Sequence, residues 1–424
     1  MMQFVLAIVS RYSSTLVQFL ISIIVANHLP ASDAGVYFMI FGVVTACSMA
    51  AGFGAPDGAV QLIPSLRLAG KLEDASRMLH AILRFGAITG LAGGFLLALS
   101  YWLLTSDLAA ALLSGLRLAG YSLNFTASQC LVAYGRSQFG TFAYYGIINW
   151  VTIIVIGVYL ALPFKVSLIG MLAAAGIGSS LGALITVSAL PLSVFRGIPG
   201  RNFPGAALQT GIPIAATRVA QTLLIWSPVW IAGIVFSASD AAVVGVASRL
   251  VMAAGSAIAA VRFSVRAQVV EFAVANRWSE LELLGKKIAK PATALCIVAA
   301  VATLAVGPYV FPLIFGKGYH ELWWVTAILL FGVLVESMAG PADEALKLLG
   351  GSRFMLVLQI VVLIGGSFAQ YVAALVVGLW AQLLISSISF GMMYIGIVSR
   401  FVQNFGVNPS IVPVRQKFRR DQRM

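Results

Sequence analysis

The sequence has 424 residues, of which 60% are hydrophobic and only 10% are charged, and its formal net charge is +13. Soluble domains carry roughly a quarter of charged residues, so a chain this apolar needs lipid rather than water around it. Aromatic residues lie inside long apolar segments and do not alternate with polar ones, which argues against a transmembrane β-barrel. We therefore expect an all-α integral membrane protein.

About twelve apolar segments, separated by Gly, Pro and charged residues, follow one another along the chain. They cover residues 4–27, 36–63, 80–104, 108–134, 141–162, 167–192, 206–236, 241–265, 288–315, 321–346, 354–375 and 378–401. Each has the length of a transmembrane helix. The first lacks a basic leading region and a small-residue cleavage site, so we interpret it as a retained helix and not a signal peptide. The three cysteines all lie within these segments, which predicts neither a disulfide nor a metal site.

The basic residues are distributed unevenly between alternate loops. One set of loops, together with the C-terminal residues, holds 21 of the 27 Lys and Arg residues, whereas the other set holds only Lys165 and Lys317. Because Lys and Arg resist translocation, the basic loops are expected in the cytoplasm. An even number of helices with both termini in the cytoplasm follows, and residues 403–424 form a basic cytoplasmic tail that either contacts anionic headgroups or stays solvated.

The chain also resembles itself at a shift of 207 residues. The shift aligns Arg11 with Arg218 and the tetrapeptide at 31–34 with the identical Ala-Ser-Asp-Ala at 238–241. It moves the first span onto the seventh, an even displacement, so the two halves share one orientation. Parallel repeats of this kind predict two pseudo-symmetric six-helix lobes around a central cavity, residues 1–200 and 201–402.

Four arginines fall inside predicted spans and away from their cytoplasmic ends, where an unpaired charge is costly and normally faces a bundle interior or water. Each lies near other polar residues at helical spacing. These polar stripes are Arg11, Ser14, Thr15, Gln18 and Ser22; Arg117, Tyr121, Asn124 and Ser128; and Arg218, Gln221 and Thr222. The stripes predict a wet, positive cavity. Arg249 is the fourth arginine, and its position also allows it to extend to the outer membrane face.

Pairing with acids is the competing interpretation of the intramembrane arginines. The acids within or near spans are Glu336, Asp343, Glu344 and Asp57. Four bases facing so few acids leave some bases for a ligand anion or water. A guanidinium binds oxyanions through paired donors and stays charged, so a phosphate or pyrophosphate is the favoured cargo, and the neighbouring amides and hydroxyls suit sugar hydroxyls. No phosphate-binding loop of the GxxxxGK[ST] type occurs, so any drive by ATP would need another subunit, and we expect no cofactor. The membrane topology accounts for the net positive charge, so we expect no nucleic-acid partner.

Five segments carry a resemblance to a known family. They are ANHLPASDAGVYFMI from residue 26, RLAGKLEDASRML from 67, VAYGRSQFG from 132, VFSASDAAVVGVASRL from 235 and LKLLGGSRFML from 346. In this order the chain resembles the Wzx-type polysaccharide and O-antigen flippases of the multidrug/oligosaccharidyl-lipid/polysaccharide (MOP) exporter superfamily. The resemblance covers nearly the whole chain and rests on diffuse signatures.

The resemblance implies alternating access that moves an undecaprenyl-pyrophosphate-linked oligosaccharide across the bacterial inner membrane, with the polysaccharide polymerase machinery as a further candidate partner. It places the cationic cavity residues at Arg11, Arg117, Arg218 and Arg249. From the polar stripes we add Gln18, Asn124 and Gln221 as substrate-binding residues. No coupling-ion motif of the family matches, so the choice of H⁺ or Na⁺ stays open, with Glu336 and Asp57 as candidate coupling groups.

Two other functions fit the sequence less well. A multidrug or other small-molecule exporter of the same fold needs acidic cation sites, whereas the first and seventh spans here carry Arg and no acid. A membrane enzyme such as a polymerase or ligase needs a large external loop with catalytic residues, and every predicted external loop has roughly ten residues or fewer. We therefore expect a transporter and not an enzyme.

Overall fold

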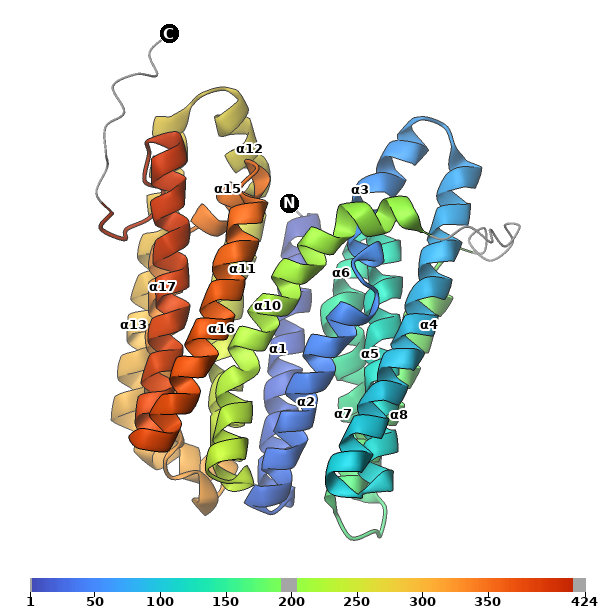
Figure 1. Ribbon diagram of the computed structural model, residues 1–424, viewed down its shortest axis with the longest axis vertical. Coiled ribbons are helices and arrows are strands. Elements are labelled where there is room, and N and C mark those ends of the chain that lie inside the picture. The colour runs from blue at the N-terminus through green and yellow to red at the C-terminus, as the bar shows by residue number, and fades with distance from the viewer. Residues whose placement is uncertain (1, 192–203, 415–424) are drawn as a thin grey trace. The chain divides into compact units, whose positions relative to one another are not determined.

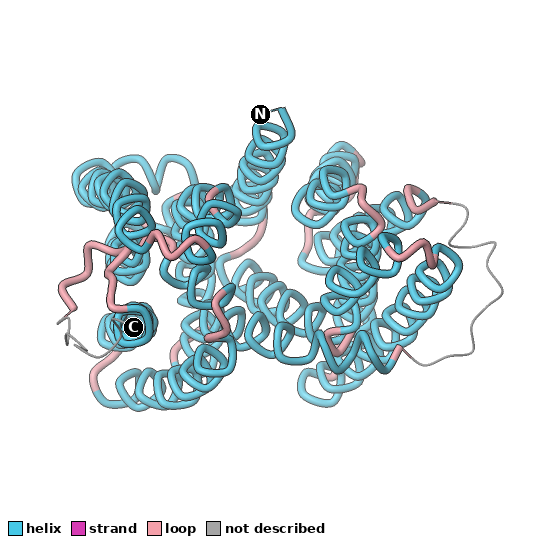
Figure 2. Tube along the Cα trace, turned by 90° about the horizontal axis from the view of Figure 1, so that it is seen from above, coloured by secondary structure: helices cyan, strands magenta, loops and turns pink. Residues whose placement is uncertain are grey.

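The computed structural model describes residues 2–191 and 204–414; the side chains of 2–12, 137, 145, 257–264, 266, 267 and 270 lie outside that description. Within it the chain forms helices and loops and no strand (Figures 1 and 2). The helices are α1 (Met2–His28), α2 (Ala31–Ala51), α3 (Ala55–Leu68), α4 (Leu72–Thr105), α5 (Leu108–Ala133), α6 (Ser137–Phe142), the π-helix η1 (Ala143–Ile147), α7 (Ile148–Ala161), α8 (Leu168–Ser188), α10 (Gly205–Val235), α11 (Ala238–Ser264), α12 (Arg266–Val274), α13 (Trp278–Phe315), the 3₁₀-helix η2 (Lys317–Tyr319), α14 (Leu322–Ala339), α15 (Ala342–Leu348), α16 (Ser352–Val376) and α17 (Leu379–Phe405).

The predicted all-α membrane architecture is confirmed. Nine of the described helices are long and apolar enough to cross a membrane, judged by length and composition. Helices α1, α5 and α7 occupy the remaining three predicted segments. The 26-residue α5 has a lower mean hydropathy because it carries Arg117, Asn124 and several hydroxyl side chains.

Two predicted spans are each divided into two helices. The segment 36–63 breaks after Ala51, where Phe53 and Gly54 adopt left-handed φ values of 46° and 84° before α3 begins at Ala55, with Pro56 in its first turn. The segment 321–346 breaks at Gly340, with φ of 57°, followed by Pro341. In both places a glycine takes the left-handed conformation and a proline removes a helical N–H. Hydropathy did not reveal these breaks because the residues around them stay apolar.

The chain divides into two compact units, Met1–Leu223 and Leu224–Met424, and the boundary falls within the helix α10. We call them unit 1 and unit 2. In unit 1, α4 packs closely on α5 because glycines line the contact. A Cβ on Gly90 would lie 2.7 Å from Ser122 Oγ, and one on Gly94 would lie 2.5 Å from Gly115 O. The GxxxG spacing of these glycines therefore serves helix packing.

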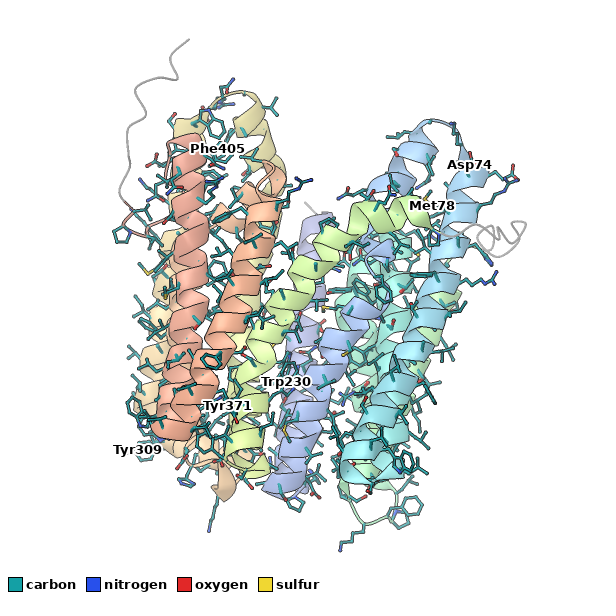
Figure 3. The ribbon with its side chains drawn as sticks, viewed as in Figure 1. Asp74, Met78, Trp230, Tyr309, Tyr371 and Phe405 are labelled. Atoms are coloured by element: carbon teal, nitrogen blue, oxygen red, sulfur yellow. The ribbon has the colours of Figure 1, made fainter. Side chains whose placement is uncertain are left out.

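In unit 2, residues 406–414 pack back onto the helices after α17 ends, and we call this segment the strap. The Ile411 N–H donates to Met338 O at 3.0 Å, next to the break at Gly340. Ser410 and Val412 are buried, and a Cβ on Gly285 of α13 would overlap Pro409 O. Figure 3 shows Phe405 at the end of α17. Its ring stacks on that of Trp278 of α13, with ring centroids 5.2 Å apart. Residues 415–424 of the predicted tail lie outside the described residues.

Four turns between helices share one backbone geometry. In each, a residue with left-handed φ follows a helix, namely Gly70, Gly135, Asn276 or Gly350. The next N–H then donates to a carbonyl five residues back, in the bonds Lys71 N–Leu66 O, Arg136 N–Leu131 O, Arg277 N–Phe272 O and Gly351 N–Leu346 O. This is the Schellman ending of a helix. The turns follow the second, fourth, eighth and tenth predicted spans, which are corresponding places in the two halves of the sequence.

Candidate functional site

Arg117 lies inside unit 1 on α5, with only 1% of its surface exposed. Its guanidinium carbon lies 4.9 Å from the ring centroid of Tyr37, 4.7 Å from that of Phe41 and 5.8 Å from that of Tyr121. One nitrogen, Nη2, donates to the Tyr37 hydroxyl at 3.2 Å. We call these three rings and the arginine the aromatic cage. Tyr37 and Phe41 are supplied by α2 and were not among the residues predicted from the sequence.

The charge of Arg117 has no acidic partner among the described residues. No carboxylate there lies within ion-pair distance, and the Nε and Nη1 atoms are buried without a hydrogen bond. Aromatic faces attract a guanidinium, and the attraction grows when water is excluded. They supply no oxygen acceptor for the remaining N–H groups, however, and a buried charged donor without one is costly. The aromatic cage therefore has two donors available for an oxyanion.

The environment of Arg218 differs from that of Arg117, although both were predicted from the sequence to line one positive cavity. Its Nη2 lies 2.6 Å from Asp57 Oδ1, and the side chain of Asp57 is 4% exposed while that of Arg218 is 28% exposed. The guanidinium carbon also lies 5.1 Å from the ring centroid of Phe125 on α5. The competing interpretation, that an arginine pairs with a buried acid, thus describes this residue. Part of the Arg218 side chain is still open to solvent.

The ion pair forms because α3 and the first part of α10 approach at their backbones. A Cβ on Gly58 would overlap the Ala207 carbonyl, and a Cβ on Gly211 would overlap that of Gly54. The left-handed residues before α3 redirect the chain towards this contact. Small residues at four-residue spacing allow such an approach, and Asp57 directly precedes Gly58 in this contact. The break in the predicted span 36–63 therefore places Asp57 against Arg218.

Arg249 lies in unit 2 on α11 and is 7% exposed. Its guanidinium carbon is 5.1 Å from the ring centroid of Trp226, which is fully buried on α10. The alternative in which Arg249 extends to the membrane surface does not apply to this buried side chain. Trp226 was not among the residues predicted from the sequence, and the structure places its ring against Arg249.

Asn124 is hydrogen-bonded within unit 1. Its Nδ2 donates to Ala143 O at 3.1 Å, and its Oδ1 accepts from the Thr186 hydroxyl at 2.6 Å. Asn124 is 3% exposed, so its polar atoms link α5 to η1 and α8. Gln18 and Gln221 are half-buried on α1 and α10. Arg11 falls in α1, but its side chain lies outside the described residues.

Of the two candidate coupling groups, Glu336 lies in unit 2 on α14. The Tyr394 hydroxyl of α17 donates to Glu336 Oε1 at 2.8 Å. A Cβ on Gly255 of α11 would lie 4.0 Å from Oε2, so a third helix also faces this carboxylate. Asp57, the other candidate, is held by Arg218, while its Oδ2 atom is buried without a hydrogen bond. Among the described residues, no three His, Cys, Asp or Glu side chains gather in a way that suits a metal ion.

Comparisons with known proteins support the fold. No protein-family model and no curated protein matches the sequence. Among solved structures, an inward-facing multidrug resistance MATE family transporter of the MOP superfamily is 15% identical, with a TM-score of 0.79 over 94% of this chain and 98% of that chain. A MOP superfamily transporter from Pyrococcus furiosus, described as having a binding pocket of reverse polarity, is 15% identical with a TM-score of 0.62 over 95% of each chain.

A third structure, an outward-facing conformation of a multidrug resistance MATE family transporter of the MOP superfamily, has a TM-score of 0.59 at 15% identity. The match covers 95% of each chain. Likeness at this identity establishes the fold and leaves the cargo open, because one fold serves many functions. The chain therefore has the twelve-helix fold of these MOP transporters. The flippase branch that the sequence resembles stays a prediction.

Proposed function

We propose that this protein is a transporter that translocates an anionic, undecaprenyl-pyrophosphate-linked oligosaccharide across the bacterial cytoplasmic membrane. The observation that carries the proposal is the aromatic cage: Arg117 is 1% exposed and has no carboxylate partner among the described residues. A buried cation without a counter-anion suits a protein whose cargo supplies the negative charge. Export of a cation favours acids in that position instead.

Arg218 also supports an anionic cargo. Its side chain is 28% exposed, so the guanidinium is open to an anion as well as to Asp57. Two arginines with different environments suit two tasks. Arg218 receives the pyrophosphate first, and Arg117 stabilises the charge once the cargo separates the aromatic rings. A guanidinium accepts both phosphate groups through paired hydrogen bonds, which an ammonium does with less geometric definition.

Lipid analysis of cells that lack the protein tests the proposal. We expect undecaprenyl-linked repeat units to accumulate in the inner leaflet, and wild-type protein to reverse this. Arg117→Met protein at equal membrane abundance should fail to reverse it, whereas Arg353→Gln, which removes an exposed arginine of α16, should succeed. Normal distribution of the lipid-linked repeat unit in the deletion strain would refute the flippase function.

Small-molecule efflux is the second candidate, and the Glu336–Tyr394 contact favours it because a membrane-embedded carboxylate suits a cation or proton site. The two functions predict opposite mutational patterns. Efflux requires that Glu336→Gln abolish transport while Arg117→Met leaves it intact. Drug accumulation measured in cells that express each variant distinguishes the two, and the flippase function predicts that neither variant changes drug accumulation.

A further inference from the structure

The π-helix η1 lies next to the residues that hold Arg218. It covers Ala143–Ile147 between α6 and α7, within a predicted span that the sequence presents as one apolar helix. A π-helical turn contains one more residue than an α-helical turn, is rare, and frequently occurs at functional sites. Its carbonyls are also displaced from the regular hydrogen-bond ladder. Such a turn persists only where neighbouring groups stabilise it.

Asn124 stabilises this turn from α5. Its Nδ2 donates to the carbonyl of Ala143, the first residue of η1, at 3.1 Å. Thr186 of α8, which is fully buried, then lies with its hydroxyl 2.6 Å from Asn124 Oδ1. With a donor and an acceptor both used, the amide is fixed in orientation and in its O/N assignment. Asn124 therefore connects α8, α5 and η1.

The residues that follow Asn124 and Ala143 also meet. Phe125 follows Asn124, Tyr144 follows Ala143, and their ring centroids are 5.7 Å apart at an interplanar angle of 57°. Phe125 is only 4% exposed, and the guanidinium carbon of Arg218 lies 5.1 Å from its ring centroid. The contacts run from Thr186 through Asn124 and η1 to Tyr144, Phe125 and Arg218, and all of these residues belong to unit 1.

We propose that Asn124 is a positioning residue which, by holding the π-turn of η1, fixes the ring of Phe125 beneath Arg218 and so aims that guanidinium at a pyrophosphate group. The identity of the anion rests on the proposed function, whereas the mechanical connection, by which Asn124 holds Arg218 in place through η1 and Phe125, does not. From the polar stripe on α5, Asn124 was predicted to contact the cargo itself. Its polar atoms are already bonded inside unit 1, and the contact with Arg218 is made through Phe125.

Hydrogen exchange measured on the full-length protein in detergent tests the mechanical connection without any cargo. Asn124→Leu keeps the volume and removes the donor to Ala143 O. We expect faster amide exchange both in 143–147 and in the α10 residues around Arg218. Thr186→Val should act in the same direction, and Thr186→Ser, which keeps the hydroxyl, should restore slow exchange. Faster exchange in 143–147 alone, with α10 unchanged, would overturn the proposal.

The matched control is Ser179→Ala, which also removes a buried hydroxyl of α8 that faces α5. Ser179 donates to Gly176 O within its own helix, and it contacts α5 at Gly120, away from Phe125. This variant should leave exchange around Arg218 as in the wild type. If it accelerates exchange there as much as Thr186→Val does, the effect is general loosening of unit 1 and the proposal is wrong.

Binding of inorganic pyrophosphate, measured by calorimetry, tests whether Asn124 orients the Arg218 guanidinium for anion binding. Asn124→Leu should weaken binding by about tenfold, a size that coupled contacting residues produce, and should do so only when Arg218 is present. In an Arg218→Gln background the same substitution should change affinity less than about twofold. Equal losses in both backgrounds would contradict the positioning role. Absence of pyrophosphate binding by the wild type would instead count against the proposed function. The hydrogen-exchange result would then still decide whether Asn124 is connected to Arg218.

Discussion

Asp57 Oδ1 and Arg218 Nη2 lie 2.6 Å apart, joining two residues that stand in different halves of the sequence. The second carboxylate oxygen of Asp57 is buried without a hydrogen bond. Asp57 therefore depends strongly on Arg218 for compensation of its charge. An anion that binds Arg218 competes with this carboxylate, so cargo binding and the α3–α10 contact are linked through one guanidinium.

Removal of Arg218 should destabilise the protein because it leaves Asp57 buried and unpaired. Breaking a buried pair in this way costs about 3–5 kcal/mol, and the partial exposure of Arg218 lowers the expected loss to about 2–3 kcal/mol. The double variant Asp57→Asn with Arg218→Gln should recover most of it. Thermal unfolding in detergent measures the change. The exposed pair Arg77–Glu73 is the control, and Arg77→Ala should change the melting temperature little.

Arg117→Met, unlike the removal of Arg218, should not destabilise the protein. The substitution leaves no carboxylate unpaired among the described residues and replaces a desolvated charge with an apolar side chain of similar length. Among the described residues, Arg117 donates a hydrogen bond only to the Tyr37 hydroxyl, and this bond is worth about 1 kcal/mol. We expect an unchanged or higher melting temperature together with loss of transport. A strongly destabilised Arg117→Met protein would mean that the aromatic cage is a structural feature of unit 1.

The backbone contact between α3 and α10 should tolerate no added methyl group. Gly58→Ala and Gly211→Ala each place a Cβ on a backbone carbonyl, so the helices must separate. We expect a loss of about 2–4 kcal/mol, within the range for overpacking and for a disrupted buried pair. Gly157→Ala in α7 is the control, since a Cβ there meets nothing within 4 Å. That variant should be neutral or slightly stabilising, and a similar loss in all three would contradict the assignment.

Docking of the strap should contribute to the stability of unit 2. Gly285→Ala places a Cβ on the Pro409 carbonyl and should displace the strap, exposing the buried Val412 and the carbonyl of Met338. Limited proteolysis should then cut within 406–414, where the wild type resists. Gly365→Ala in α16, where a Cβ meets nothing within 4 Å, is the matched control. Equal protease resistance of wild type and Gly285→Ala would contradict the docking.

Hydropathy and loop spacing predicted the helices well because lipid demands a long apolar segment wherever the chain crosses. They could not locate the breaks at Gly54 and Gly340, where conformation changes while hydropathy does not. The intramembrane arginines were also recognised from the sequence, but their partners were not. Asp57 and Arg218 are far apart along the chain, and only the α3–α10 contact brings them together.

The helical spacing of polar residues did not reveal what each residue of a stripe does. Arg117 and Asn124 share one stripe on α5, yet the first has donors without acceptors and the second is fully engaged by Ala143 and Thr186. The aromatic residues around Arg117 could have been suspected, since Tyr37 and Phe41 stand one helical turn apart on α2. Nothing in the sequence marks Ala143–Ile147 as a π-helix.

The four Schellman turns place a left-handed residue directly before or close to a basic one, as in Gly70-Lys71, Gly135-Arg136 and Asn276-Arg277. The residue that ends each helix and the positive charge that is predicted to set the orientation of the chain in the membrane are therefore neighbours in the sequence. A deletion or insertion at one of these turns displaces both the left-handed residue and the neighbouring basic residue. Errors of folding and errors of topology should consequently arise from the same mutations in this protein, and loop-length variation between related sequences should be rare at these four positions.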